Sequence, residues 1–253
     1  MTGVSRRAGI AWTVAHRLAA DGFDVTASGW PGHDRDQPWG DDPGAAPAMP
    51  WLGADLADPD TPARLVAEHV RRAGSLDALV AVHARSSDQD LATVTAAELD
   101  ASFAVNARAT VLLVQAAAAA GVRRVVLFTT GVHQGPMPTE IPYVVSKAAI
   151  QGVTATLAAA LAPIGATVNC VNPGPNDTGW ADEPTRAAIA AAMPLAPRWG
   201  TPADVTELVA FLVSDAAAWI TGQTIDSDGG WGVREGVAPR SSVSGAATAT
   251  GRR

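Results

Sequence analysis

Residues 129–147 read TTGVHQGPMPTEIPYVVSK, and this stretch contains Tyr143, the only tyrosine of the chain. Lys147 follows four positions later, about one helical turn, so both side chains project from one face of a helix. A phenol with its ordinary pKa of about 10 becomes a usable acid or base near neutral pH only where a cation favours the phenolate. Another hydroxyl stands upstream at Thr130, across a loop rich in glycine and proline. The stretch therefore predicts a proton-transfer site at the start of a helix.

Taken alone, the spacing also suits an amphipathic pair on a solvated helix face, because Tyr-x-x-x-Lys occurs by chance in many proteins. Its surroundings resemble the active-site segment of the short-chain dehydrogenase/reductase family, and the resemblance extends from Thr2 to about Trp231. It implies a single-domain, doubly wound α/β fold of the Rossmann type, with a parallel sheet. It also implies hydride transfer between a nicotinamide dinucleotide and a small carbonyl compound or secondary alcohol.

The resemblance implies four catalytic residues. Thr130, in the place of the family's usual serine, would hydrogen-bond the substrate oxygen, and Tyr143 would pass the proton. Lys147 would hold the nicotinamide ribose and lower the pKa of the tyrosine. Asn106 would hold the lysine and a water in a proton relay; asparagine disfavours helix interiors, so a compensating role is expected there.

Composition indicates one α/β domain of 253 residues, 47% of them hydrophobic, which is enough to bury a large core. The net charge of −7, without a basic stripe, argues against nucleic-acid binding. Cys170 is the only cysteine, so no internal disulfide is expected, and no apolar run has membrane-spanning length. We therefore predict a cytoplasmic protein with a domain over residues 1–236, a disordered tail over 237–253, no metal site and no membrane partner.

The opening residues Thr2–Ala11 form a glycine-rich turn before a helix predicted over 12–20. Glycines in such a turn let backbone N–H groups approach a pyrophosphate, which the helix N-terminus favours. The turn resembles the family's Thr-Gly-x-x-x-Gly-x-Gly motif, with two extra residues before Gly9 and Ala11 at the last glycine. Without the resemblance, it would be an ordinary helix-entry loop. The implied cofactor contacts are Gly3, Ser5, Arg6, Arg7, Gly9 and Ile10.

The choice of cofactor depends on the end of the next predicted strand, at 25–28. NAD-preferring members carry an acidic residue there that binds the ribose hydroxyls, and this chain has none. Arg6 and Arg7 lie in the preceding turn, where a guanidinium can pair with a 2′-phosphate. We therefore predict NADP, with NAD left open because Asp34 or Asp36 could swing in and because both arginines could be merely solvated.

Helical and strand patterns alternate along the rest of the chain. Residues 31–50 read as a long surface loop, and Asp55 and Leu56 resemble the pair that brackets the adenine ring. Residues 172–178, NPGPNDT, resemble the loop that meets the nicotinamide, which assigns Pro173, Gly174, Asn176 and Thr178 to the cofactor site; residues 179–200 occupy the place of a mobile substrate lid. Helices are predicted at 62–73, 98–120 and 201–214, and strands at 76–82, 125–128, 166–171 and 221–228.

The segment Ala81–Arg85, AVHAR, departs from the family's Asn-Asn-Ala-Gly. A lone histidine is more often structural, so we favour that role for His83 and leave Arg85 open. The departure and Thr130 motivate a second hypothesis, a nucleotide-binding protein that has lost turnover and acts by sensing or interaction. The complete set of Tyr143, Lys147 and Asn106 favours an enzyme. A third hypothesis is an elimination, such as dehalogenation, on the same scaffold.

The substrate is not identified by any motif. Members with this overall pattern include 3-oxoacyl carrier-protein reductases, but no feature of the sequence indicates an acyl carrier partner. The resemblance also implies a homodimer or homotetramer.

One strand is unaccounted for. In the family resembled here, a first strand of about five apolar residues precedes the Thr-Gly turn and lies mid-sheet, between the strands near Val25 and Leu76. Thr2 directly follows Met1, and no apolar segment is left for that place. Strands lie about 4.8 Å apart, so the omission would leave two neighbours roughly 10 Å apart with unpaired backbone groups. We expect a natural start upstream, and reduced stability and cofactor affinity without that strand.

Overall fold

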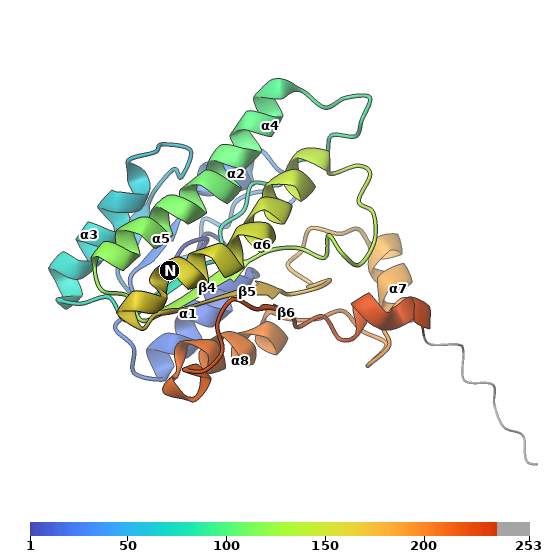
Figure 1. Ribbon diagram of the computed structural model, residues 1–253. Helices are drawn as coiled ribbons and strands as arrows, with labels where there is room; N and C mark the ends of the chain where they lie inside the picture. The colour runs from blue at the N-terminus through green and yellow to red at the C-terminus, as the bar shows by residue number, and fades with distance from the viewer. Residues whose placement is uncertain (237–253) are drawn as a thin grey trace, which may run out of the picture.

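A sheet of parallel strands runs through the protein, whose structure, a computed structural model, describes residues 1–236 (Figure 1). The tail predicted over 237–253 lies outside these residues. Strand β1 pairs with β2, while β3, β4, β5 and β6 pair in chain order, every pair in parallel. The strands are β1 (Ala27–Gly29), β2 (Trp51–Gly53), β3 (Ala78–Ala81), β4 (Arg124–Phe128), β5 (Thr167–Asn172) and β6 (Thr224–Asp226).

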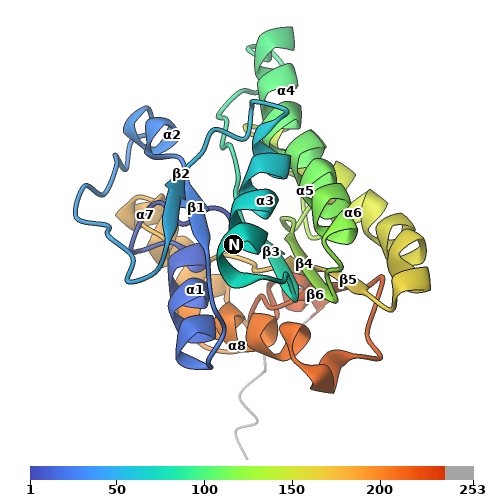
Figure 2. The same ribbon diagram turned by 90° about the vertical axis from the view of Figure 1, so that its left-hand side faces the viewer.

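Helices cover both faces of the sheet (Figure 1, Figure 2). Helices α1 (Ile10–Ala20) and α8 (Pro202–Val213) pack together on one face, and α3 (Thr61–Ala73), α5 (Ala109–Ala119) and α6 (Ile141–Leu161) cover the other. Side chains alternate along a strand, so Val125 and Leu127 of β4 join the α5 and α6 core while Val126 and Phe128 join the α1 and α8 core. The fold is therefore the predicted doubly wound α/β domain.

Residues Met1–Val4 run between β1 and β3. The Thr2 N–H donates to the Val80 carbonyl at 3.1 Å, and the Ser28 N–H donates to the Met1 carbonyl at 2.9 Å. Thr2 forms parallel bridges to both neighbours, Ser28 and Ala81. The expectation that no segment takes the place of the first central strand therefore needs correction, because Met1–Val4 fill the end of that place nearest the glycine turn.

Beyond Met1, the space between the two neighbouring strands is a cavity of about 150 Å³, lined on one side by residues 23–28 and on the other by residues 75–80. Among residues 1–236, no backbone hydrogen bond joins residues 23–26 to residues 75–79. The α-amino group of Met1 donates to the Thr26 carbonyl at 2.7 Å, and burial lowers its pKa from 8.0 to about 6. The strand-pairing gap expected from the sequence is present in this part of the sheet.

Two short elements were not predicted. The stretch expected to be a loop contains helix α2 (Pro31–Arg35), which begins at a proline, and Trp51–Gly53 forms β2. The helix predicted over 98–120 has three parts: α4 (Ala96–Ser102), a π-helical segment (Phe103–Arg108) and α5. The remaining helices are α7 (Glu183–Ala192) and the 3-10 turns Ala162–Ile164, Asp215–Ala217 and Trp231–Gly236.

Candidate active site

A second cavity, of about 700 Å³, lies at the carboxyl ends of the strands, where open α/β sheets bind their ligands. The glycine turn, the ends of β1, β3 and β4, the first turns of α6 and the loop after β5 all contribute to its wall. All predicted site residues line this cavity except Arg7 and Asn106. The predicted residues that line it are Gly3, Ser5, Arg6, Gly9, Ile10, Asp55, Leu56, Thr130, Tyr143, Lys147, Pro173, Gly174, Asn176 and Thr178.

The glycine turn closes one end of this active-site cavity. Gly9 is the N-cap of α1 and provides no side-chain cap, so the N–H groups at this helix start are available to an anion. Gly3 has a φ of +86°, and a Cβ there would lie 2.8 Å from the backbone nitrogen of His83. A Cβ on Gly29, at the end of β1, would lie 2.3 Å from the Val4 carbonyl oxygen. These glycines permit the close approach of turn and strands that forms this wall.

The two arginines of the turn lie in different environments. Arg6 lines the cavity, with its guanidinium 3.2 Å from the Asp34 carboxylate and over the ring of Trp39. Arg7 lies outside the lining and forms a two-pronged ion pair with Asp42, at 2.8 Å for each bond. The structure therefore places Arg6, but not Arg7, on the cavity wall, and it places Asp34 beside Arg6.

Strand β4 and helix α6 bring the catalytic candidates together. Thr130 follows β4, and the neighbouring Thr129 hydroxyl donates to the Lys147 carbonyl at 3.0 Å, which joins the strand end to the helix. Tyr143 and Lys147 lie one turn apart on α6, with the lysine Nζ 5.9 Å from the centre of the phenol ring. Thr130 also lies near the phenol of Tyr143, where its hydroxyl acts to lower the phenol pKa. Tyr143 and Lys147 therefore lie on one face of α6, as their spacing predicts.

The electrostatics of this pair differ from the expectation. Burial lowers the pKa of Lys147 to about 8, and its Nζ donates to the backbone carbonyls of Phe128 at 3.1 Å and His83 at 3.4 Å. Burial, and then the charge of Glu140, raise the pKa of Tyr143 to about 12, against the opposing effect of Thr130. This direction is opposite to the lowering expected from Lys147, because desolvation of the phenol favours its neutral form.

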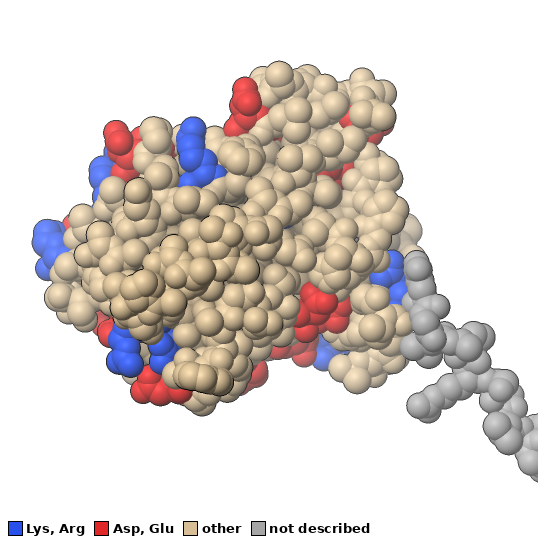
Figure 3. All heavy atoms as spheres, in the orientation of Figure 1, with Lys and Arg blue, Asp and Glu red and all other residues tan. Residues whose placement is uncertain are grey.

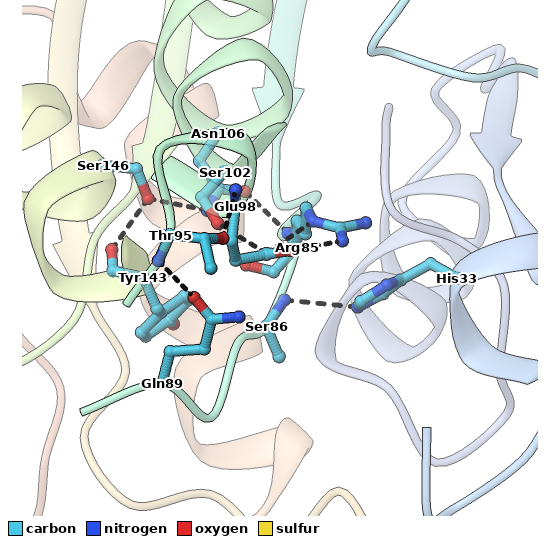
Figure 4. Close-up of polar contacts among 10 residues, drawn as sticks. All are labelled: His33, Arg85, Ser86, Gln89, Thr95, Glu98, Ser102, Asn106, Tyr143 and Ser146. Carbon is cyan, nitrogen blue, oxygen red and sulfur yellow. Dashed lines mark hydrogen bonds and ion pairs between the residues drawn. The ribbon is translucent and has the colours of Figure 1, made fainter. Parts of the chain in front are cut away.

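Asn106 lies in the π-helical segment and is buried outside the cavity lining (Figure 4). Its side-chain oxygen accepts from the Arg85 N–H at 2.6 Å, and its amide donates to the Arg85 carbonyl at 3.1 Å and to the Ser146 hydroxyl at 2.8 Å. These contacts hold the end of β3 against α6. Within residues 1–236 they include no direct hydrogen bond to Lys147, so these contacts make Asn106 a positioning residue, and its place in a water relay stays a prediction.

His83 and Arg85 both have partners. The His83 Nε2–H donates to the Val105 carbonyl at 3.0 Å, so Nδ1 accepts from the Thr2 hydroxyl at 2.7 Å, and burial lowers the pKa of the imidazole to about 3. The structural role favoured for His83 fits these contacts. Arg85 forms a two-pronged ion pair with Glu98, 2.8 Å for each bond, at the cavity wall (Figure 4).

Sequence reasoning missed two acidic residues of the cavity, Asp88 and Glu140. They are distant in sequence, and the Ile141 N–H joins their segments by donating to the Gln89 carbonyl at 3.0 Å. The Gln89 side chain also accepts from the Thr95 N–H at 3.0 Å (Figure 4). Only the position of Glu140, three residues before Tyr143, is a sequence signal.

The family model described as Enoyl-(Acyl carrier protein) reductase matches residues 3–232. The structure is similar to that of a mutant short-chain dehydrogenase/reductase of Serratia marcescens, with a TM-score of 0.78 and 28% identity, over 91% of this chain and 96% of that one. This chain belongs to the short-chain dehydrogenase/reductase family. Membership makes it an oxidoreductase of the class that transfers hydride with nicotinamide cofactors.

Curated relatives of this short-chain dehydrogenase/reductase cover most of its length. An uncharacterized oxidoreductase of Bacillus subtilis, YjdA, is 32% identical over 91% of this chain and 95% of its own. The 3-oxoacyl-[acyl-carrier-protein] reductase FabG of Staphylococcus aureus is 30% identical over 91% of this chain and 96% of its own. Human dehydrogenase/reductase SDR family member 4 is 31% identical over 88% of this chain and 83% of its own.

Proposed function

We propose that this protein is an NADP(H)-dependent oxidoreductase that interconverts a small carbonyl compound and a secondary alcohol, with Tyr143 as proton donor and acceptor. One observation carries the proposal. Thr130, Tyr143 and Lys147 converge on the same 700 Å³ cavity that the glycine turn and Arg6 close at another wall. A dinucleotide site and a proton-transfer site are therefore continuous.

The residues present fit a nicotinamide dinucleotide. The start of α1 offers N–H groups for a pyrophosphate, Asp55 and Leu56 line the wall, and the loop after β5 contributes Asn176 and Thr178. Arg6, which pairs with Asp34 on the cavity wall, is the guanidinium that would meet a 2′-phosphate, and this supports the choice of NADP. When bound, the nicotinamide would supply or accept the hydride.

The remaining chemistry belongs to the protein's own side chains. A pKa of about 12 keeps Tyr143 protonated at neutral pH, so its phenol can donate to a substrate oxygen during reduction. The Thr130 hydroxyl lies beside it and can hydrogen-bond the same oxygen. Lys147, with its pKa lowered to about 8, keeps a positive charge below the phenol at neutral pH.

The test is Tyr143→Phe, which removes one hydroxyl and leaves the packing of the ring. We expect turnover of NADPH with a panel of carbonyl compounds to fall at least about 100-fold, since a positioned general acid contributes that much or more. Nucleotide affinity, measured by calorimetry, should be unchanged. Retained turnover would overturn the assignment of Tyr143. Nucleotide binding without turnover in the unaltered protein would favour the sensing or interaction hypothesis.

We also propose that the protein is a cytoplasmic homodimer or homotetramer that assembles through α5 and α6. The helical stretches Ala96–Ala119 and Ile141–Ile164 are long and apolar enough to cross a membrane, but both pack on the sheet. Only 44% and 33% of their most apolar parts are buried, so an apolar surface stays exposed. Figure 3 shows few charged side chains over this face. A second copy would cover it. A monomeric mass by light scattering would contradict this proposal.

A further inference from the structure

The side chain of Gln134 packs against the residue that follows Thr130. Gln134 lies in the loop between β4 and α6, and its N–H donates to the Gly131 carbonyl at 2.9 Å. A Cβ on Gly131 would lie 2.5 Å from the Gln134 Oε1, and a Cβ on Gly232 would lie 2.8 Å from its Nε2. The amide therefore fills a slot that exists because both neighbours are glycines. A shift of this amide would move Gly131 and, with it, Thr130.

Asp228 holds the nitrogen end of the same amide. The Gln134 Nε2 donates to the Asp228 Oδ2 at 2.7 Å, and the carboxylate also accepts from the backbone N–H groups of Gly230 and Gly232, each at 2.9 Å. These three donors fix the carboxylate in the turn that follows β6. A charge-assisted hydrogen bond thus ties the loop after β4 to the turn after β6.

The loop after β5, residues 172–178, packs against the same aspartate. Gly174 has a φ of +63°, and a Cβ there would lie 2.4 Å from the Asp228 Cβ. Asp228 therefore contacts the loop assigned to the nicotinamide on one side and Gln134, next to the Thr130 backbone, on the other. Neither Gln134 nor Asp228 is among the described residues that line the active-site cavity.

Stability does not explain the amide at this place. The Gln134 Oε1 is buried and has no hydrogen-bond partner within residues 1–236. A buried acceptor without a partner costs free energy, and a methionine of similar shape would avoid that cost. The bond from Nε2 to Asp228 is what the amide contributes here, and this points to a positional role.

We propose that Gln134 and Asp228 are positioning residues that set the place of the Thr130 hydroxyl relative to the loop at 172–178. The inference rests on the proposed function, because it takes Thr130 to hydrogen-bond the reacting oxygen. That oxygen must reach Thr130 while the reacting carbon faces the nicotinamide held by the other loop. A misplacement of about 1 Å between such groups can cost about 100-fold in rate.

Gln134→Met tests the inference, because it keeps the shape of the side chain and removes its bond to Asp228. We expect kcat with NADPH and a carbonyl compound to fall about tenfold, the loss expected for Thr130→Ala, because the same substrate hydrogen bond is weakened. KM for NADPH should be unchanged. The midpoint of denaturant unfolding should be unchanged or higher, because the orphaned acceptor is removed. In a Thr130→Ala background, Gln134→Met should lower kcat no further.

Two more variants complete the test. Asp228→Ala removes the acceptor, and it should lower kcat no further in protein that already carries Gln134→Met. Gln223→Met is the matched control, since the Gln223 Nε2 donates to the Thr221 carbonyl at 2.9 Å before the start of β6, outside the cavity lining. It should leave kcat unchanged. Unchanged kcat in Gln134→Met would overturn the inference, as would a further fall in the Thr130→Ala background.

Amide hydrogen exchange separates this inference from the proposed function, because it needs no turnover. In Gln134→Met, peptides that cover residues 129–137 and 172–178 should exchange faster than in the unaltered protein, and in Gln223→Met they should not. Absence of turnover in the unaltered protein, together with this faster exchange, would sink the proposed function and support the positioning of the two loops. Unchanged exchange in Gln134→Met would sink the positioning alone.

Discussion

Burial reverses the usual order of acidity of Tyr143 and Lys147. The pKa of the phenol rises to about 12 and that of the ammonium falls to about 8, so the lysine loses its proton first as pH rises. The phenol therefore holds its proton throughout the neutral range. This order suits the proposed donation of the phenol proton to a carbonyl oxygen.

Thr130 supplies the hydroxyl beside the phenol. Thr130→Ser keeps the donor and frees the χ1 rotamer, so we expect activity that is preserved or raised. Thr130→Ala removes the donor, and kcat should fall about tenfold or more, the value of a hydrogen bond that strengthens as charge develops. The measurement is the reductive rate of both variants with one carbonyl substrate. Full activity in Thr130→Ala would show that the hydroxyl has no role.

The separation of Arg6 from Arg7 allows a paired test of cofactor choice. NADPH should bind more tightly than NADH, and Arg6→Ala should reduce that preference about tenfold, since it removes one charge-assisted contact. Arg7→Ala should leave the preference intact, because Arg7 pairs with Asp42 outside the cavity.

Because Arg6→Ala would leave the buried Asp34 without its ion-pair partner, the arginine change is also made together with Asp34→Asn. Dissociation constants of both nucleotides are measured for each variant. Equal affinities for NADPH and NADH in the unaltered protein would contradict the prediction.

At the scale of elements, the π-helical segment joins three parts of the fold through Asn106. Asn106→Ala would leave the Arg85 N–H without its acceptor, so we expect a loss of about 1–3 kcal/mol in the free energy of unfolding together with lower kcat. Ser146→Ala is the control, since it removes only one of these bonds. Denaturant unfolding and steady-state rates decide the role. Unchanged stability with a lower kcat would support the proton relay over positioning.

The elements that could be predicted from the sequence are those whose residues are buried and therefore apolar. Strand β4 is buried along its whole length, so Val125–Phe128 reads as a continuous apolar run. Strand β2 has three residues, two of them exposed, and α2 has five residues. Both are too short to show a periodic pattern of apolar residues in the sequence. The π-helical segment was missed because its residues continue the helical pattern on both sides.

The candidate site was predictable where motifs are local. The turn at Gly3–Ile10 and the pair Tyr143 and Lys147 have fixed spacings within short stretches. Asp88 and Glu140 reach one cavity because segments distant in sequence meet there, which no local pattern encodes. The direction of the tyrosine pKa also depends on burial, which spacing does not specify.

At the scale of the molecule, the gap beside Met1 is a weakness that added sequence can repair. A chain extended upstream of Met1 by a strand of about five apolar residues should fill the 150 Å³ cavity and pair residues 23–26 with residues 75–79. We expect a higher melting temperature and tighter NADPH binding, because the new strand supports the glycine turn. An extension of equal length made of Gly and Ser is the control. If the apolar extension improves neither property, the unfilled space beside Met1 limits neither the stability nor the cofactor affinity of this chain.

The chain that starts at Met1 and the chain extended by the apolar strand should differ in how their melting temperatures depend on pH. The Met1 amine has its pKa lowered from 8.0 to about 6, so the unfolded chain binds more protons between these values and stability rises with pH there. The pKa of His69 is lowered by desolvation and then by the charge of the Met1 amine, against the charges of Asp24 and Asp77, so His69 acts in the same direction in the unextended protein. Extension replaces the amine by an amide, so its advantage in melting temperature should be larger at about pH 6 than at about pH 8.

The cavity beside Met1 also makes the protein sensitive to hydrostatic pressure. Unfolding floods internal voids, so the system volume shrinks by an amount that scales with them, typically about 20 to 100 mL/mol for a domain. The cavity of about 150 Å³ beside Met1 is partly open to solvent, and within residues 1–236 no backbone hydrogen bond joins the strand ends on its two sides, residues 23–26 and 75–79. Compression should therefore open the sheet between β1 and β3 before it disturbs the ladder of β3 to β6.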